Sequence, residues 1–447
     1  MKRGVLIIAG LVVVLVAVFV VVTLVNRGNV VSEDKSLTVY LPFDEVKTYQ
    51  KISEQFITAN PGAELNFKFI DAKDAKEYEA KVVNEIADGA GPDIWVVRSD
   101  WIPKHAAKSL PYTADNENPI ASAKTVIEPA LVDLNIYQGE LYGVPLFADS
   151  LAVIYNVDFI RAVADGASAS VVKTLSQFPA TWKVVQDQAA LVSKKSGSVI
   201  TRSAIALGTI ETGYAPVDVL SAMLVQNGAS VLNDDETKVA FDLAQFKDGK
   251  SSFPATEALD LFTSFARSSK SNYSWNNDLG AALEAFKAGK TGAIIGYYSL
   301  LRELVDEEPS FEIGVAALPQ ISTKTDRVDF GITWSHIINA QSTAPVLAKS
   351  YLSYLTQGDV QKAYIELTGK IGAAPLEQEV SDDISSPGLA ASEVYWPQLK
   401  TVQQLTKKDW QRVDEILQDT VKLVINSKGS LQSAINTAAK QLEELIK

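Results

Sequence analysis

Five segments near the start of the chain alternate between strand and helix spacing, and this alternation constrains the fold more than any other feature. Residues 37–41, 65–69 and 94–97 are short runs rich in β-branched and aromatic side chains, while 46–59 and 75–87 repeat apolar residues at helical spacing. Strand, helix, strand, helix, strand predicts a parallel sheet with crossover helices. Ligands of such sheets bind beyond the carboxyl ends of the strands, so the loops after Leu41 and Val97 are the first candidate positions for a site.

A second α/β segment follows the break at residues 142–145. Its strand-like runs are 151–155, 292–296 and 313–319, and its helical patterns lie near 181–193, 216–227 and 256–268. Two amphipathic helices close the chain, and Ser430 is the expected N-cap of the second. The roughly 415 residues beyond the N-terminal segment exceed what one hydrophobic core usually organises, so we expect two lobes.

The N-terminal segment has the pattern of a membrane span. Residues 5–25 form an uncharged run of 21 residues, which as a helix is roughly 31 Å long. Two cations precede the run and only Arg27 follows it, which predicts a cytoplasmic N-terminus and an extracytoplasmic body. The alternative is a cleaved signal peptide, which has a shorter apolar region and small residues at the cleavage site. We expect residues 1–28 to be a single-pass anchor in the cell membrane and 29–36 a linker.

Composition excludes several chemistries. The chain has no Cys, and its only histidines are His105 and His336, so disulfides, thiolate nucleophiles and zinc-thiolate or three-histidine sites are excluded. The net charge is −13, and it becomes −16 without the three N-terminal cations, which disfavours binding to nucleic acid. No common enzyme motif is present, and no pair of carboxylates is singled out by its spacing. We expect no catalytic residue, metal or cofactor.

Aromatic residues at the ends of the strand-like runs are the strongest candidates for a binding site. A flat ring can stack on the apolar face of a sugar while neighbouring polar side chains bind the hydroxyl groups. The aromatic candidates are Trp101, Trp275, Trp334, Tyr297 and Tyr298, and the polar ones are Asp100, Asp149, Glu211, Asn276 and Asn277. Trp182 and Trp410 lie in amphipathic helices and are interpreted as core, and Trp95 could be either.

Several segments, taken in order, match one family. They are 87–94 with Trp101, 141–149, 151–156, 178–182 and 285–296, and the last, AFKAGKTGAIIG, is the most specific. On these motifs the chain resembles extracellular solute-binding proteins of family 1, the maltose-binding-protein-like receptors of sugar ABC importers. The matching segments cover nearly all of residues 37–447.

The resemblance implies a two-lobed periplasmic-binding-protein-like fold, with two discontinuous α/β lobes and a central ligand cleft. The expected lobes are 36–147 with 296–335, and 148–295 with 336–447. Carried over by position, the cleft residues are Phe43, Asp44, Asp100, Trp101, Asp149, Glu211, Trp275, Tyr297, Tyr298 and Trp334. The implied partners are a sugar or oligosaccharide and the permease subunits of an ABC transporter, with the receptor a monomer.

Two departures from the family pattern affect these expectations. The family in Gram-positive bacteria is commonly tethered through a lipidated cysteine, which this chain lacks, so the tether would be the N-terminal helix. The Gly-Gly typical near the ligand is replaced by FGITW at 330–334.

Three alternatives stay open. The same fold could bind a polyamine, or ferric iron through the adjacent Tyr297 and Tyr298, and a carboxylate-dependent glycosidase is the enzymatic alternative. If Trp275 is an aromatic anchor, its replacement by Ala weakens ligand binding by roughly 1–3 kcal/mol and leaves the fold intact.

Overall fold

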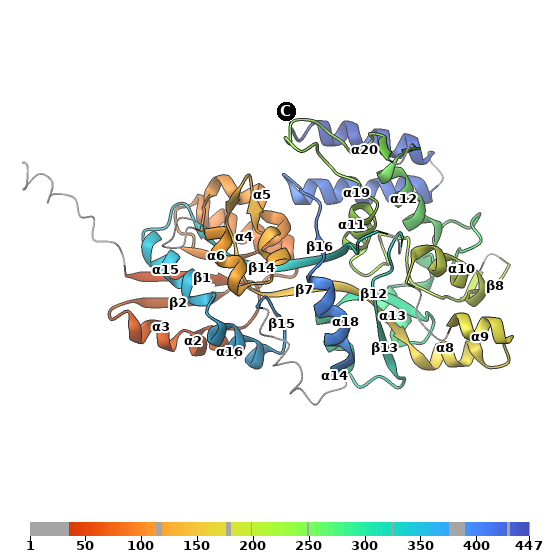
Figure 1. Cartoon of the computed structure of the whole chain (residues 1–447), viewed down its shortest axis with the longest axis horizontal. Coiled ribbons are helices and arrows are strands. Elements are labelled where there is room, and N and C mark those ends of the chain that lie inside the picture. Colours follow the sequence, from red (N-terminus) through yellow and green to blue (C-terminus); the bar gives the residue numbers. More distant parts are fainter. Residues whose placement is uncertain are drawn as a thin grey trace, which may run out of the picture.

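Two α/β lobes lie side by side in the computed structural model, and two long strands run from one into the other (Figure 1). The structure describes residues 35–112, 119–175, 180–197, 199–247, 250–322, 325–374, 389–426 and 430–446. Within these ranges no helix is both long and apolar enough to cross a membrane. The expected anchor at 1–28 lies outside the described residues.

The first lobe contains the predicted parallel sheet. Strands β1 (Ser36–Leu41), β2 (Glu64–Phe69) and β3 (Ile94–Arg98) pair in parallel with β1 in the middle. The other elements before the first crossing are α2 (Val46–Ile52), α3 (Glu54–Ala59), α4 (Ala75–Ala87), α5 (Ile102–His105), β4 (Ser109–Leu110), α6 (Pro119–Val126), α7 (Pro129–Asp133), β5 (Ile136–Tyr137) and β6 (Glu140–Leu141). The alternation that opens the sequence is therefore confirmed, with one predicted helix divided at Ser53.

Strands β7 (Val144–Asn156) and β14 (Asp329–Asn339) connect the lobes. They pair antiparallel across the junction, and the main sheet runs in the order β12-β7-β14-β3-β1-β2. The start of β7 and the end of β14 lie in the first lobe, where β14 pairs with β3. The end of β7 lies in the second lobe, where it pairs with β12 (Ala293–Tyr297) and β13 (Ile313–Ala317). Because both strands are continuous, they fix the point about which the lobes can move.

The second lobe is mostly helical around its part of the sheet. Before β14 it contains α8 (Val157–Ala164), α9 (Ala169–Leu175), α10 (Trp182–Val192), β8 (Lys194–Ser196), β9 (Val199–Arg202), α11 (Pro216–Gln226), β10 (Gln245–Lys247), β11 (Lys250–Ser252), α12 (Pro254–Ser264), α13 (Ala282–Lys287) and α14 (Tyr298–Asp306). After β14 it contains α18 (Leu389–Leu399), β16 (Val402–Gln403), α19 (Trp410–Ile425) and α20 (Leu431–Glu443). Ser430 caps α20 as expected, because its hydroxyl accepts the N–H of Ser433.

The observed packing divides the chain between the lobes differently from the expected ranges. Residues 296–317 were expected in the first lobe, but β13 pairs with the second-lobe end of β7 beside β12. Helices α15 (Pro345–Leu355) and α16 (Gly358–Thr368) were expected in the second lobe, but they pack near α2 and α3 in the first (Figure 1). The physical reason is that the chain crosses at β14 itself and returns only after β15 (Ile371–Gly372).

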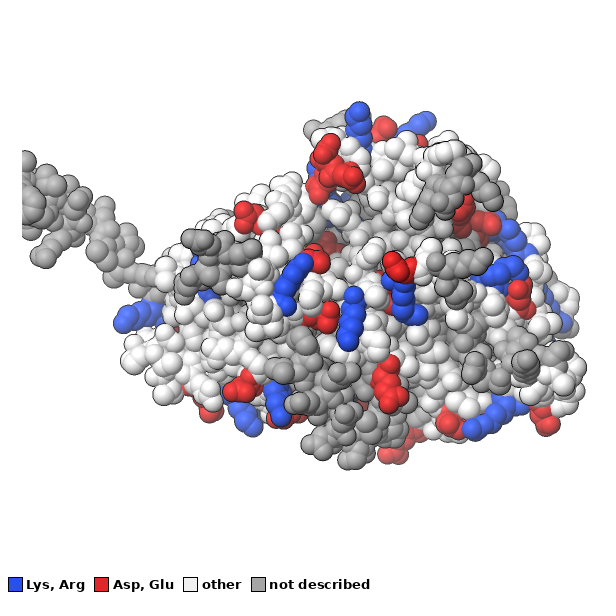
Figure 2. Space-filling view, viewed as in Figure 1, with Lys and Arg blue, Asp and Glu red and all other residues white. Residues whose placement is uncertain are grey.

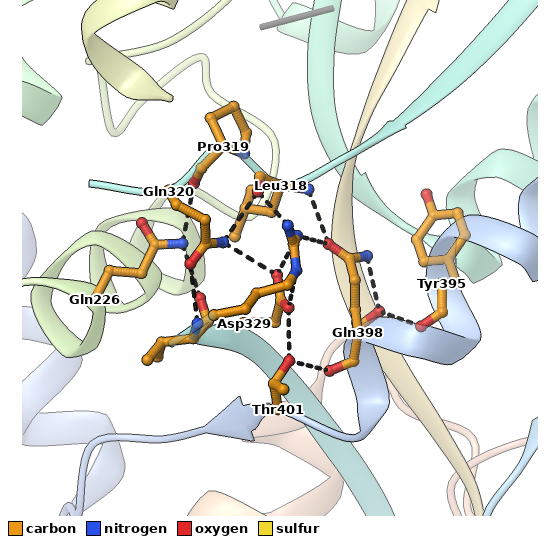
Figure 3. A network of polar contacts seen from close by, with 11 residues as sticks. Gln226, Leu318, Pro319, Gln320, Asp329, Tyr395, Gln398 and Thr401 are labelled. Carbon is orange, nitrogen blue, oxygen red and sulfur yellow. Dashed lines mark hydrogen bonds and ion pairs between the residues drawn. The ribbon is translucent and has the colours of Figure 1, made fainter. Parts of the chain in front are cut away.

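A polar network ties the second-lobe end of β14 to α18 and β16 (Figure 3). Asp329 accepts a hydrogen bond from Thr401 at 2.8 Å and from the Arg327 guanidinium at 2.7 Å. Gln398 of α18 accepts the Leu318 N–H at 2.8 Å. Burial raises the pKa of Asp329, and Arg327 opposes that rise. These bonds hold α18 and the residues that follow it against the second-lobe end of β14.

Candidate functional site

Aromatic side chains meet where the strands of the first lobe end. Phe43 follows β1 and lies with its ring centroid 5.0 Å from Trp334 and 5.9 Å from Phe147, both edge to face. Trp334 of β14 pairs with Arg98, the last residue of β3, and is partly buried among apolar side chains of both lobes. The carboxyl ends of the parallel strands thus face the junction, as the sheet pattern predicts, and Asp44 is exposed in the same loop.

The second lobe contributes Asp149 and a group of tyrosines. Asp149 of β7 accepts the N–H groups of Tyr298 at 2.7 Å and Ser299 at 3.1 Å, at the start of α14. Burial raises the pKa of Asp149 to about 6, although these hydrogen bonds oppose the rise. Tyr298 is partly buried, with its ring edge to face on Tyr395 at 5.5 Å. Tyr214 is near enough that the charge of Asp149 adds to burial in raising its pKa to about 12. We call Phe43, Phe147, Asp149, Tyr298 and Trp334 the junction site.

A charged cluster bridges the two lobes beside the junction site. The Arg98 guanidinium donates to both oxygens of Asp100 at 3.0 and 3.1 Å, and to both oxygens of Asp218 in α11 at 3.2 and 3.4 Å. The Tyr297 hydroxyl donates to Asp218 at 2.8 Å. Lys407 of the second lobe lies 3.6 Å from Asp100. Charges of one lobe are therefore neutralised by charges of the other.

The electrostatics of this cluster favour its ionised form. Burial raises the pKa of Asp218, but Arg98 and Lys407 outweigh burial and hold it below its usual value. Burial lowers the pKa of Lys407, and Asp414, Asp100 and Asp218 outweigh burial, so it lies above its usual value. Figure 2 shows charged side chains of both signs over the middle of the visible face, where the lobes meet.

Two of the expected aromatic residues are fully buried. Trp101 is covered by Trp410, which stacks on it with centroids 5.1 Å apart and planes at 10°. Neither indole N–H of this pair has a hydrogen-bond partner in the described part of the chain. Trp275 lies in the core and donates its N–H to Thr212 at 3.1 Å. Trp275 therefore presents no open ring face, because its apolar surface is already packed against the protein.

The remaining expected residues have other surroundings. Glu211 is exposed and accepts a hydrogen bond from Asn277 at 3.3 Å, within the second lobe. Asn276 is partly buried, donates to the Tyr273 hydroxyl at 2.9 Å and caps a short 3-10 turn, Asn277–Leu279. Asp100 and Tyr297 belong to the charged cluster and not to the aromatic junction site.

Several polar residues at or beside the junction were missed at the level of sequence, among them Arg98, Asp218, Lys407 and Lys370, the last of which forms an ion pair with Glu45. Arg98 lies two residues before Asp100 and could have been noticed as its partner. Asp218 and Lys370 carry no local signal, because their ion-pair partners, Arg98 and Glu45, are more than a hundred residues away in the chain.

A pair of α/β lobes joined by two long strands, with polar and aromatic side chains from both lobes at the junction, defines a two-lobed solute-binding protein. The chain belongs to the bacterial extracellular solute-binding protein family, whose model matches residues 43–362. The expected family resemblance is thereby confirmed.

Individual relatives agree with this assignment at low identity. A putative binding protein of Brucella abortus is 22% identical over 417 residues, which is 89% of this chain and 90% of the relative. The sugar-binding protein MalE of Xanthomonas citri has a TM-score of 0.71 at 17% identity, with 92% of this chain and 97% of that chain covered. An ABC substrate-binding protein of Listeria monocytogenes, solved with cycloalternan, has a TM-score of 0.68 at 17% identity, with 92% and 98% covered. These structures establish the fold of the body.

Proposed function

We propose that the chain is the extracytoplasmic receptor of an ABC importer and binds a sugar or oligosaccharide at the junction site. The observation that carries this proposal is that Trp334 pairs with Phe147 of β7, while Asp149, two residues further along the same strand, accepts the N–H groups at the start of α14. The rings offer apolar faces and edges, and the carboxylate and phenol supply hydrogen bonds to hydroxyl groups. Similar proteins whose names state a sugar ligand, including the maltotriose-binding protein of Pyrococcus abyssi, support the ligand class.

Closure of the lobes explains how binding is signalled. A solute held by Phe43 of one lobe and Tyr298 of the other makes its full set of contacts only when the lobes are closed. Such differential affinity shifts the population to the closed form. Permease subunits that recognise the closed form then distinguish loaded from empty receptor.

Membrane attachment through residues 1–28 is part of the same proposal. The run at 5–25 supports it, since no cysteine is present for a lipid tether. Mass spectrometry of the receptor extracted from membranes tests it. The intact N-terminus is the expected result, and a chain beginning near residue 29 contradicts the anchor.

Ferric iron and glycoside hydrolysis are less well supported by the geometry. The Tyr297 hydroxyl is already bound to Asp218, which leaves the adjacent tyrosines poorly placed to ligate ferric iron together. Within the described residues no cluster of three or more His, Asp or Glu is placed to hold a metal ion. The glycosidase alternative requires sustained release of reducing sugar that is lost on a single carboxylate substitution.

A thermal-shift screen tests the proposed ligand class. Neutral sugars, oligosaccharides, spermidine and ferric citrate are compared on the wild type, Trp334→Ala and Phe253→Ala. A sugar should raise the melting temperature of the wild type and of Phe253→Ala, whose changed ring is exposed in the second lobe away from the junction. It should have a much smaller effect on Trp334→Ala. No response to any sugar contradicts the ligand class, and an equal response in all three proteins contradicts the site.

A further inference from the structure

An aromatic cage beside the junction site encloses an ammonium group. The Nζ atom of Lys370 lies 3.9 Å from the ring centroid of Phe147, 4.1 Å from that of Phe43 and 5.9 Å from that of Tyr364. Three ring faces around one cation form the arrangement that proteins use to bind organic ammonium groups. Two of these rings, Phe43 and Phe147, belong to the junction site itself.

A carboxylate completes the cage. Glu45 accepts a hydrogen bond from the Lys370 ammonium and another from the Tyr364 hydroxyl, the latter at 2.7 Å. The Lys370 ammonium also lies 3.4 Å from the Tyr364 hydroxyl. The side chains of Glu45 and Lys370 are 14% and 24% exposed. The cage is therefore largely, but not completely, screened from water.

Lys370 stays in the cage at an electrostatic cost, and its backbone lies next to the strand that carries one of the rings. Burial lowers the pKa of Lys370, and Glu45 only partly restores it. Lys370 lies directly before β15, which pairs with β7 beside Phe147. Lysine has a flexible four-carbon stem, so rotation about its side-chain bonds would withdraw the ammonium and leave the three rings and Glu45 in place.

The charges around the junction favour a cationic ligand. The charges of two carboxyl groups, those of Glu45 and Asp149, act on the one ammonium charge of Lys370, which leaves an acidic excess at the cage. Removing Lys370 from the cage increases this acidic excess, so an incoming ammonium group would restore the balance.

We propose that the cage of Phe43, Phe147, Tyr364 and Glu45 binds an ammonium group of the ligand, and that Lys370 is its tethered occupant in this structure. This inference deepens the proposed function, since it assigns to the same site a ligand that carries an amine. The amine belongs either to an amino sugar or to a polyamine, and the experiment below distinguishes the two.

Two substitutions at one position separate an empty cage from a filled one. Lys370→Ala empties the cage, while Lys370→Met removes the charge but leaves an apolar stem between the rings. Calorimetric titration with tetramethylammonium at constant ionic strength should show binding to Lys370→Ala at least tenfold tighter than to the wild type or Lys370→Met. The gain should disappear in Lys370→Ala/Glu45→Gln. Equal affinities of Lys370→Ala and Lys370→Met overturn the proposal.

A measurement on the wild type keeps the proposal testable if Lys370→Ala does not fold. Reductive methylation of lysines is followed by mass spectrometry, with the exposed Lys47 as the internal reference. Tetramethylammonium should increase the labelling of Lys370 relative to Lys47, because the displaced side chain becomes accessible. An unchanged ratio up to the highest concentration at which the protein stays folded overturns the proposal.

Natural ligand classes are compared in matched pairs. Glucosamine binding more tightly than glucose to the wild type supports the cage and assigns the amine to a sugar, while binding of spermidine alone supports it and assigns a polyamine. If neutral sugars bind and no ammonium compound does, the cage inference fails and the sugar receptor stands. If only ammonium compounds without a sugar bind, the proposed sugar function fails and the cage inference stands.

Discussion

The Arg98–Asp218 ion pair should couple the two lobes energetically. Arg98 ends β3 in the first lobe and Asp218 lies in the first turn of α11 in the second, and their side chains are 17% and 10% exposed. The perturbation is Arg98→Met, which keeps the side-chain stem, and Asp218→Asn, which keeps the shape and an acceptor for the Tyr297 hydroxyl. Both changes remove charge from the bridge with little loss of packing.

The size of the coupling follows from the geometry. Charges 3.2 Å apart attract by roughly 5 kcal/mol at an effective dielectric constant of about 20. Desolvation of both groups offsets much of that attraction. Arg98 keeps Asp100 when Asp218 is changed, and Lys407 still acts on Asp100 and Asp218 when Arg98 is changed, so neither substitution leaves the cluster without an opposite charge. We expect each single variant to lose about 2 kcal/mol of unfolding free energy, with a coupling energy of about 1.5 kcal/mol.

A double-mutant cycle measures this coupling by urea denaturation of the four proteins. The exposed helix pair Lys183 and Asp187, whose side chains are 72% and 60% exposed, provides a control cycle that should show no coupling beyond experimental error. The Arg98–Asp218 coupling should also persist at high salt, because buried charges are poorly screened. If the losses of unfolding free energy from Arg98→Met and Asp218→Asn simply add in the double variant, the argument that this pair joins the lobes is refuted.

Three further predictions concern single residues. Burial lowers the pKa of His336 to about 4, below the ordinary value of 6.5, so the unfolded chain binds the proton first as pH falls. The free energy of unfolding therefore falls by up to about 3 kcal/mol between pH 6.5 and pH 4. His336→Gln should lack this loss when its stability is measured over the same pH range. The pH dependence of stability is opposite for Asp149, because its pKa is raised to about 6 in the folded protein. The wild type should lose stability as pH rises from about 4 to 6, and Asp149→Asn should remove that loss. Trp275→Ala should cost about 3–5 kcal/mol of unfolding free energy by creating a cavity, and a change confined to ligand affinity in calorimetry would return Trp275 to the binding site.

The sequence predicted the first lobe well because its sheet depends on local periodicity. The strand and helix patterns between residues 37 and 97 are set by side chains a few positions apart, and the structure reproduces them. The crossing strands were harder to predict. Pro145 and the glycine at 143 suggested a break, whereas β7 runs through Pro145 and pairs with β14 on one side.

The site could be predicted only where the fold determines the position of a residue. Phe43 and Trp334, both expected in the cleft, lie at the junction because Phe43 follows a parallel strand and Trp334 is part of a strand that crosses between the lobes. Their role in ligand binding stays a prediction. Burial of Trp101 depends on Trp410, more than three hundred residues later, and no local pattern reports that contact. The same is true of Asp218 and Lys370, whose partners come from distant segments.

The interlobe distance in the presence and absence of a ligand tests the central claim most directly. The chain has no cysteine, so Ala59→Cys in α3 and Lys440→Cys in α20 place one spin label on an exposed position of each lobe without removing any native thiol. Double electron–electron resonance then measures the distribution of distances between the two labels. With the sugar identified by thermal shift, we predict a shift to a single narrower distribution that Trp334→Ala does not show. Identical distributions with and without saturating sugar would contradict a site that closes between the lobes.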